Sequence, residues 1–224
     1  MANNGNGGFT GNSSGAPMLP VQGSPGVWVD RGGNKYQVLN VREDVVYDTI
    51  LIPAGAIAAG SEFLFFTQFN QKRQGDSNMK SPRLGSGVVM KIYHYGFKIL
   101  DAAGNIIMLP RDMKKVISGG FAKIKLGGFD IAEGPVERFQ SPFGLTGSTT
   151  ENDSGLVSLG VPSQAAMRPL AEPIFVDQNA DFEGSLRFDD HLWTAGGMIM
   201  PTLDRIVAVR LYFLGLVGKA ATQS

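Results

Sequence analysis

The chain has 224 residues, enough for a single large β domain with a buried core. Its 20 Lys and Arg residues balance its 20 Asp and Glu residues, so no net charge draws it toward nucleic acid or an anionic membrane. Cysteine is absent, which excludes disulfides, thiolate zinc sites and cysteine nucleophiles and is typical of a reducing cytosol.

The first segment, residues 1–33, is rich in Gly, Asn, Ser and Pro and carries only two charged side chains, Asp30 and Arg31. Such a segment buries too little apolar area to offset its ordering entropy, so we expect an extended N-terminal arm. The arm lacks the basic residues of a genome-binding arm and the apolar stretch of a secretory signal. We expect one folded domain over 34–218, followed by a short tail over 219–224.

From residue 34 the pattern is that of β-strands, with β-branched and aromatic residues between Gly, Pro and Asn turns. The segment 61–69 is apolar on both faces, which predicts a strand covered on both sides. The segment 121–131 alternates cleanly, and 172–176 with 181–188 look like a strand pair. Further strands are predicted over 35–41, 44–55, 88–100 and 106–110.

Helix is predicted at one place only, residues 111–118, which Gly119 and Gly120 end. Two long loops interrupt the strands. The polar loop 70–87 holds Lys72 and Arg73, and the Gly/Ser/Pro-rich excursion 132–170 is of a length that is usually functional or held by a partner.

The closing segment, 203–219, is the most hydrophobic of the chain, but Arg210 interrupts it and its uncharged runs are far shorter than the roughly 18 residues of a membrane helix. Its β-branched residues and period of two predict the last strand of a sheet. Its core face is then formed by Val207, Val209, Leu211 and Phe213. Arg210 and Tyr212 would face a neighbour or solvent.

Candidate chemistry is sparse. The histidines, His94 and His191, lack a nucleophile elbow, so packing roles are favoured over a catalytic triad. A metal is conceivable at Asp189–His191 or at Asp177–Glu183, which resembles the start of a calcium loop. However, Phe182 and Phe188 stand where that loop needs Gly and Glu, so an ordinary turn is favoured. We therefore expect no enzyme and no cofactor.

The order of segments resembles the single jelly-roll coat proteins of icosahedral bacteriophages. The resemblance covers roughly residues 34–218 and rests on five segments of this sequence. These are the Gly/Asn-rich arm, "EFLFFTQF", "SGGFAKIKLGGFDI" with the excursion after it, "AEPIFVDQNADFEGSLRF" and "IVAVRLYFLGLVG". It implies an all-β fold, an antiparallel β-sandwich of jelly-roll type with an extended arm and long loops. It also implies a viral capsid protein that assembles with itself, without a catalytic site, in a virion formed in the host cytoplasm.

Composition favours assembly independently, because only 18% of the residues are charged, as on a surface that partners cover. The residues predicted at the subunit interface are Arg210, Tyr212, Lys72 and Arg73. Three alternatives stay open: a trimeric head-decoration or cement protein, a vertex protein, and a carbohydrate-binding module. The last would stack sugars on Tyr93, Tyr95 or Trp193.

Overall fold

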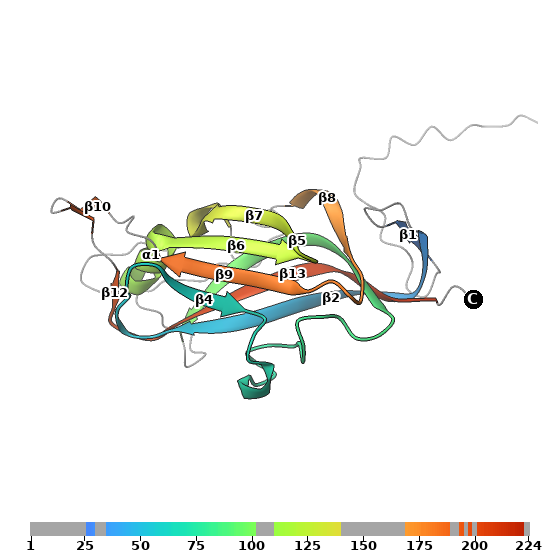
Figure 1. The fold of residues 1–224 in the computed structure, drawn as a ribbon, viewed down its shortest axis with the longest axis horizontal. Coiled ribbons are helices and arrows are strands. Elements are labelled where there is room, and N and C mark those ends of the chain that lie inside the picture. Colours follow the sequence, from blue (N-terminus) through green and yellow to red (C-terminus); the bar gives the residue numbers. More distant parts are fainter. Residues whose placement is uncertain are drawn as a thin grey trace, which may run out of the picture.

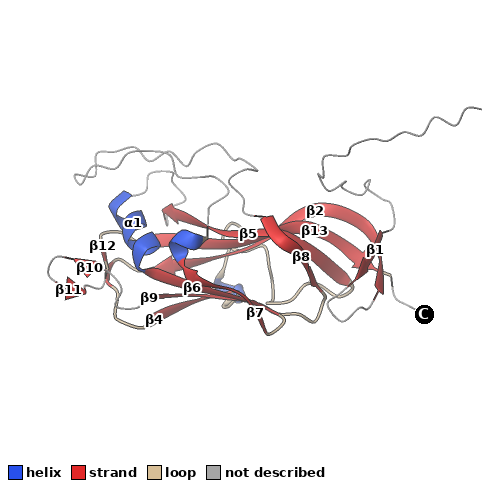
Figure 2. Ribbon diagram, turned by 90° about the horizontal axis from the view of Figure 1, so that it is seen from above, coloured by secondary structure: helices blue, strands red, loops and turns tan. Residues whose placement is uncertain are grey.

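The computed structural model describes residues 26–29, 35–101, 110–139, 169–188, 193–194, 197–198 and 201–221. Within these ranges the chain forms two antiparallel β-sheets that pack face to face around one main core (Figure 1). Figure 2 shows the two layers from above, with helix α1 (Pro110–Gly119) at one end. The predicted class, an all-β antiparallel sandwich, is confirmed.

The first sheet has five strands in the order β1-β2-β13-β5-β8, and the second has four in the order β4-β9-β6-β7. The strands of the two sheets are β1 (Gly26–Val29), β2 (Lys35–Ile52), β4 (Ser61–Phe65), β5 (Val88–Asp101), β6 (Gly120–Leu126), β7 (Phe129–Pro135), β8 (Pro169–Val176), β9 (Phe182–Phe188) and β13 (Val207–Ala220). Two short ribbons add β3 (Gly55–Ala56) with β12 (Thr202–Leu203), and β10 (Trp193–Thr194) with β11 (Gly197–Met198). The helical elements are η1 (Phe69–Gln71), α1 (Pro110–Gly119) and η2 (Val136–Arg138).

Strand β13 lies at the centre of the five-stranded sheet, where it pairs along its length with β2 and β5. Its alternate residues Val207, Val209, Leu211 and Phe213 are buried in the core, none more than 6% exposed. Period-two alternation on a strand requires this placement. The predictions of a strand and of its core face are both confirmed.

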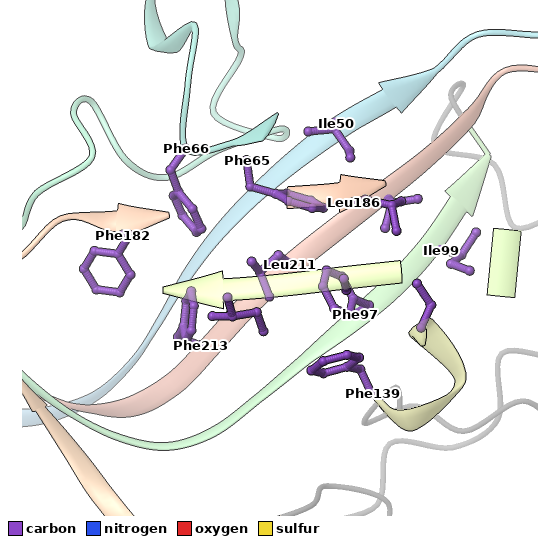
Figure 3. Packing of buried hydrophobic residues seen from close by; sticks show 14 of the residues in the cluster. Ile50, Phe65, Phe66, Phe97, Ile99, Phe139, Phe182, Leu186, Leu211 and Phe213 are labelled. Atoms are coloured by element: carbon purple, nitrogen blue, oxygen red, sulfur yellow. The ribbon is translucent and has the colours of Figure 1, made fainter. Parts of the chain in front are cut away.

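Phenylalanine rings fill the space between the sheets (Figure 3). Phe66, Phe182 and Phe213 form a triangle with ring centroids 5.3 to 5.9 Å apart. Phe97 contacts Phe65 at 5.6 Å and Phe139 at 5.3 Å. Each such pair adds about 0.5–1.5 kcal/mol beyond the burial of apolar area, so these rings tie the sheets together.

Strand β4 departs from the prediction of a strand covered on both faces. It is an edge strand, and its Leu64 is 52% exposed. It ends at Phe65, and Phe66 adopts a left-handed backbone with φ 58°. This reversal turns two consecutive residues, Phe65 and Phe66, into the core at 2% exposure each. A backbone kink therefore produces the double burial that the sequence suggested for a whole strand.

The segment 121–131 is a hairpin and not one strand. Strand β6 buries alternate residues, as predicted, and then Gly127 and Gly128 turn the chain with φ of +56° and +80°. Two successive positive φ values are what a two-residue hairpin turn requires. Strand β7 follows and η2 continues to Arg138, so the predicted excursion 132–170 is wrong in its first residues. Residues 140–168 lie outside the described part.

Strands β8 and β9 do not pair with each other, contrary to the prediction. β8 pairs with β5 at the edge of the first sheet, whereas β9 lies between β4 and β6 in the second. The turn 177–181 between them therefore crosses from one sheet to the other. Local sequence could not reveal this, because pairing across a sandwich is decided by distant strands.

A second apolar cluster lies on the opposite face of the five-stranded sheet. Consecutive residues of a strand belong to different clusters. On β8, Val176 lies in the main core and Phe175 packs on the second cluster; on β13, Val217 packs on the main core and Leu216 lies in the second cluster. Trp28 of β1 covers this second cluster and meets Phe175 edge-on at 6.2 Å. Residues 26–29, assigned to the arm from sequence, thus belong to the sheet; residues 1–25 lie outside the described part.

Helix α1 confirms the predicted helix over 111–118. It begins with Pro110, which suits a first helical position and not the end of the strand predicted over 106–110; residues 106–109 lie outside the described part. Val116 faces the core with no exposure. The buried carboxylate of Asp112 accepts hydrogen bonds from the backbone N–H groups of Asp204 at 3.1 Å and Arg205 at 3.0 Å. This contact fixes the chain where it enters β13.

Candidate functional site

Three of the four residues predicted at a subunit interface are engaged within the chain. Lys72 and Arg210 fix the loop after β4 onto the first sheet, and Tyr212 is 6% exposed. Only Arg73 is exposed. The assignment of these residues to an interface stays a prediction. Tyr212 lies on the face opposite the main core, as expected for a side chain toward a neighbour or solvent, but it is buried within the chain.

The loop lies along the outer edge of β2. Ser77 forms an isolated antiparallel bridge with Asp48. The side chain of Asn78 accepts from the N–H of Tyr47 at 2.9 Å and donates to the carbonyl of Val45 at 2.5 Å. Unpaired edges invite other chains to pair, so this loop protects β2 from such pairing along these residues.

Lys72 enters the core side of the same strand. Its Nζ lies 2.5 Å from Oδ2 of Asp48, a carboxylate with no exposure. The same oxygen accepts the N–H of Phe66 at 2.6 Å, which holds the left-handed kink after β4. A buried carboxylate needs such partners, so Lys72 serves the fold here.

Arg210 acts on the opposite face of the sheet. Its guanidinium stacks on the ring of Tyr47 at 4.6 Å, donates to Oγ1 of Thr49 at 3.0 Å and to the carbonyl of Gly75 at 2.5 Å. Lys98 lies directly across from it on β5. The pKa of Lys98 is below its ordinary value. The main cause is burial of its ammonium group, and the second is repulsion from the charge of Arg210.

Tyr212 lies on this face too, opposite Gly96 of β5. Burial raises the pKa of its phenol well above the ordinary value, so the ring stays neutral over the physiological range. A neutral, packed tyrosine is a structural residue in this chain. It offers little surface to a neighbour.

Among the residues that the structure describes, no group of three His, Asp or Glu side chains could hold a metal ion. Asp177 caps its own turn by accepting from the N–H of Asn179 at 2.8 Å, and Asp181 pairs with Arg83 at 2.6 Å. The resemblance of Asp177–Glu183 to a calcium loop thus reflects a turn. His94 lies on β5, while Asp189–His191 lies outside the described residues.

The tyrosines considered as sugar platforms are packed against the fold. Tyr95 contacts Phe139 of the main core at 6.1 Å, and Tyr93 packs on the second cluster. Burial raises the pKa of Tyr93. Trp193 lies on the β10–β11 ribbon, and its side chain is outside the described part.

A surface that sequence reasoning missed lies where β1 pairs with β2. Val27 is 66%, Val29 52% and Leu39 40% exposed, on the face opposite Trp28. We call it the β1–β2 face; its exposed residues are Val27, Val29, Lys35, Gln37, Leu39 and Lys219. The Val-Trp-Val alternation in "GVWV" was the available signal, but the Gly-rich context hid it. Figures 1 and 2 place β1 at the end of the molecule where the first sheet extends past the second.

A groove lies between β7 and β8, the outermost described strands of the two sheets on this side. We call it the edge groove; its volume is about 520 Å³. Apolar residues of both strands line it, among them Phe129, Ile131 and Phe175. Its charged lining residues are Asp177, Asp181 and Glu183, all acidic. It combines an apolar lining with an acidic rim.

No family model matches the chain, and no curated protein matches its sequence. Of the helices in the described ranges, none has both the length and the apolar character needed to cross a membrane.

Proposed function

We propose that the sandwich is a jelly roll and that the chain is a structural virion protein, a capsid protein that assembles with itself into an icosahedral bacteriophage shell. The order of the strands carries this proposal. Counted along the chain, β2, β4, β5, β6, β7, β8, β9 and β13 are strands one to eight. The first sheet then has the order 1-8-3-6 beside β1, and the second the order 2-7-4-5.

Two interlocked Greek keys, the arrangement of a jelly roll, would give the same order, which supports the proposal. Only the β6–β7 hairpin stays within one sheet; every other connection between consecutive members of the eight crosses the sandwich. Jelly rolls occur in viral capsids, lectins and cupins, so the order supports the class and not one function within it.

The surface favours the capsid reading among these classes. Large apolar side chains stand exposed on the β1–β2 face and at Phe129, which is 64% exposed, beside the edge groove. Contiguous exposed apolar residues mark interaction sites. Only 18% of the residues are charged and the net charge is zero. Such a composition suits a chain packed among copies of itself better than a free monomer, which needs surface charge to stay soluble.

The partners are then other copies of this chain, with further virion proteins as additional contacts, and the location is the virion. The chain needs no catalytic group in this role. A trimeric cement or vertex protein would share the fold and the apolar surfaces. It differs in assembly, because it would stop at a trimer or another small oligomer on its own.

Mass photometry and electron microscopy of the purified chain test the proposal. We expect large multimers or closed shells at micromolar concentration. A discrete trimer would favour the cement or vertex role. A stable monomer would contradict the structural role, and a glycan-array signal lost in Trp193→Ala would favour carbohydrate binding.

A further inference from the structure

We infer that the edge groove of one copy receives the β1–β2 face of a second copy. The inference rests on the proposed function, because it assigns the surfaces through which copies of the chain assemble. The two surfaces carry opposite charge around apolar centres.

The β1–β2 face is an apolar ridge with a basic border. Val29 lies opposite Lys35, and Leu39 lies opposite Lys219, so each lysine stands beside an exposed apolar side chain. None of the six residues of this face is acidic. The lysines would border the apolar centre of a contact.

The edge groove has the complementary character. Phe129 projects at its mouth with 64% exposure, and Ile131 lies beside it on β7. No lysine or arginine is among the residues that line the groove. Asp181 is already paired with Arg83, so Glu183, which is exposed and lies across from Lys125 of β6, and Asp177 supply the rest of its negative charge.

Complementary charge around apolar centres gives a contact its orientation and excludes like-with-like pairing. Two ridges would bring lysines together, and two grooves would bring carboxylates together. When the edge groove of one copy binds the β1–β2 face of another, the pair still has one free edge groove and one free β1–β2 face. Further copies can therefore add through the same contact. The assembly ends as a closed ring or shell where the rotation between neighbouring copies brings the last copy back to the first.

The strand edges favour the same occupant. Among the described residues β7 pairs only with β6 and β8 only with β5, so the two strands that flank the groove are the outermost described strands of their sheets. β1 carries no charged residue and no proline, the usual protections of an edge strand. Docking of another copy would cover all three of these outer strands.

Charge swaps test the contact. Lys219→Glu and Glu183→Lys should each raise the concentration needed for assembly by about tenfold, because like charges then meet in the interface. The double variant should assemble nearly as the unmodified chain does. Lys80→Glu and Glu137→Lys, exposed residues outside both surfaces, are matched controls that should change nothing. Circular dichroism verifies that each variant is folded.

Cross-linking gives a second readout, since the chain has no cysteine of its own. Val27→Cys mixed with Phe129→Cys should form covalent dimers with a short bismaleimide, and the doubly substituted chain should form a ladder. Cross-links in Val27→Cys alone would overturn the unlike pairing. A multimeric chain without cross-links or charge response overturns the docking only, whereas a monomeric chain that gives no cross-link overturns the proposed function as well.

Discussion

The Nζ atom of Lys72 lies 2.5 Å from Oδ2 of Asp48, and this buried ion pair joins the loop after β4 to the core face of β2. The other carboxylate oxygen, Oδ1, is buried and has no hydrogen-bond partner among the residues that the structure describes. Within the described part of the chain, Lys72 and the N–H of Phe66 are the groups that compensate this carboxylate. Removing one partner of a buried ion pair destabilises the fold by more than the intact pair stabilises it, because the other charge stays buried.

Lys72→Met should lower the free energy of unfolding by about 3–5 kcal/mol, because it leaves a charge buried without its counterion. Asp48→Asn combined with Lys72→Met should recover much of that loss, since the asparagine oxygen can still accept the N–H of Phe66. Urea unfolding of the three proteins measures both effects. A single variant as stable as the double would contradict the role of the ion pair.

Arg210→Ala should release the loop from the outer face of the sheet. The variant loses the stacking on Tyr47 and the hydrogen bond to the carbonyl of Gly75. Hydrogen exchange at residues 74–78 should then be faster while the amides of β13 stay protected.

Arg73→Ala is the matched control for this loop, because Arg73 is exposed and we expect no change in the exchange of residues 74–78. Equal exchange in the Arg210 variant and the unmodified chain would show that other contacts hold the loop.

Strand periodicity was sufficient to predict the class of fold and the central strand. Successive side chains of a strand point to opposite faces, so every second residue of β13 points to the core. These residues are Val207, Val209, Leu211 and Phe213, and all four are buried. The helix over 111–118 was equally readable, since the glycines that end it are local signals, although its first residue, Pro110, was assigned to a strand.

Features that depend on distant residues could not be read in this way. Phe66 is buried because its backbone turns left-handed on a hydrogen bond from a carboxylate 18 residues away. Lys72 resembled a surface residue because it lies in a loop and its partner, Asp48, lies on β2, 24 residues away. Arg210 was placed correctly on the outer face, but the loop that covers it comes from residues more than a hundred positions away.

Close packing between β13 and β5 makes a glycine necessary at position 215. A β-carbon there would lie 2.2 Å from the carbonyl oxygen of Lys91, and a backbone atom in the sheet cannot move aside. Gly215→Ala should therefore lower the free energy of unfolding by at least about 1–3 kcal/mol, as overpacking does in cores. Thermal unfolding measures it. Gly75→Ala is the control, since nothing lies within 4 Å of its β-carbon position; equal melting of the two variants would contradict the steric argument.

The last prediction concerns pH and the ion pair that ties the turn before β9 to the loop before β5. Arg83 donates to both carboxylate oxygens of Asp181, at 2.6 and 3.1 Å, and these hydrogen bonds hold the pKa of Asp181 below its ordinary value. A depressed pKa stabilises the fold above the unfolded value of about 3.9, and that stabilisation is lost as the pH falls through the folded pKa. The unmodified chain should thus be more stable than Arg83→Gln at pH 7, and the difference should shrink below about pH 4. Urea midpoints between pH 7 and pH 3 give the comparison, with high salt as a second way to weaken this exposed pair. A difference that is independent of pH would mean that Arg83 acts through packing and not through its charge.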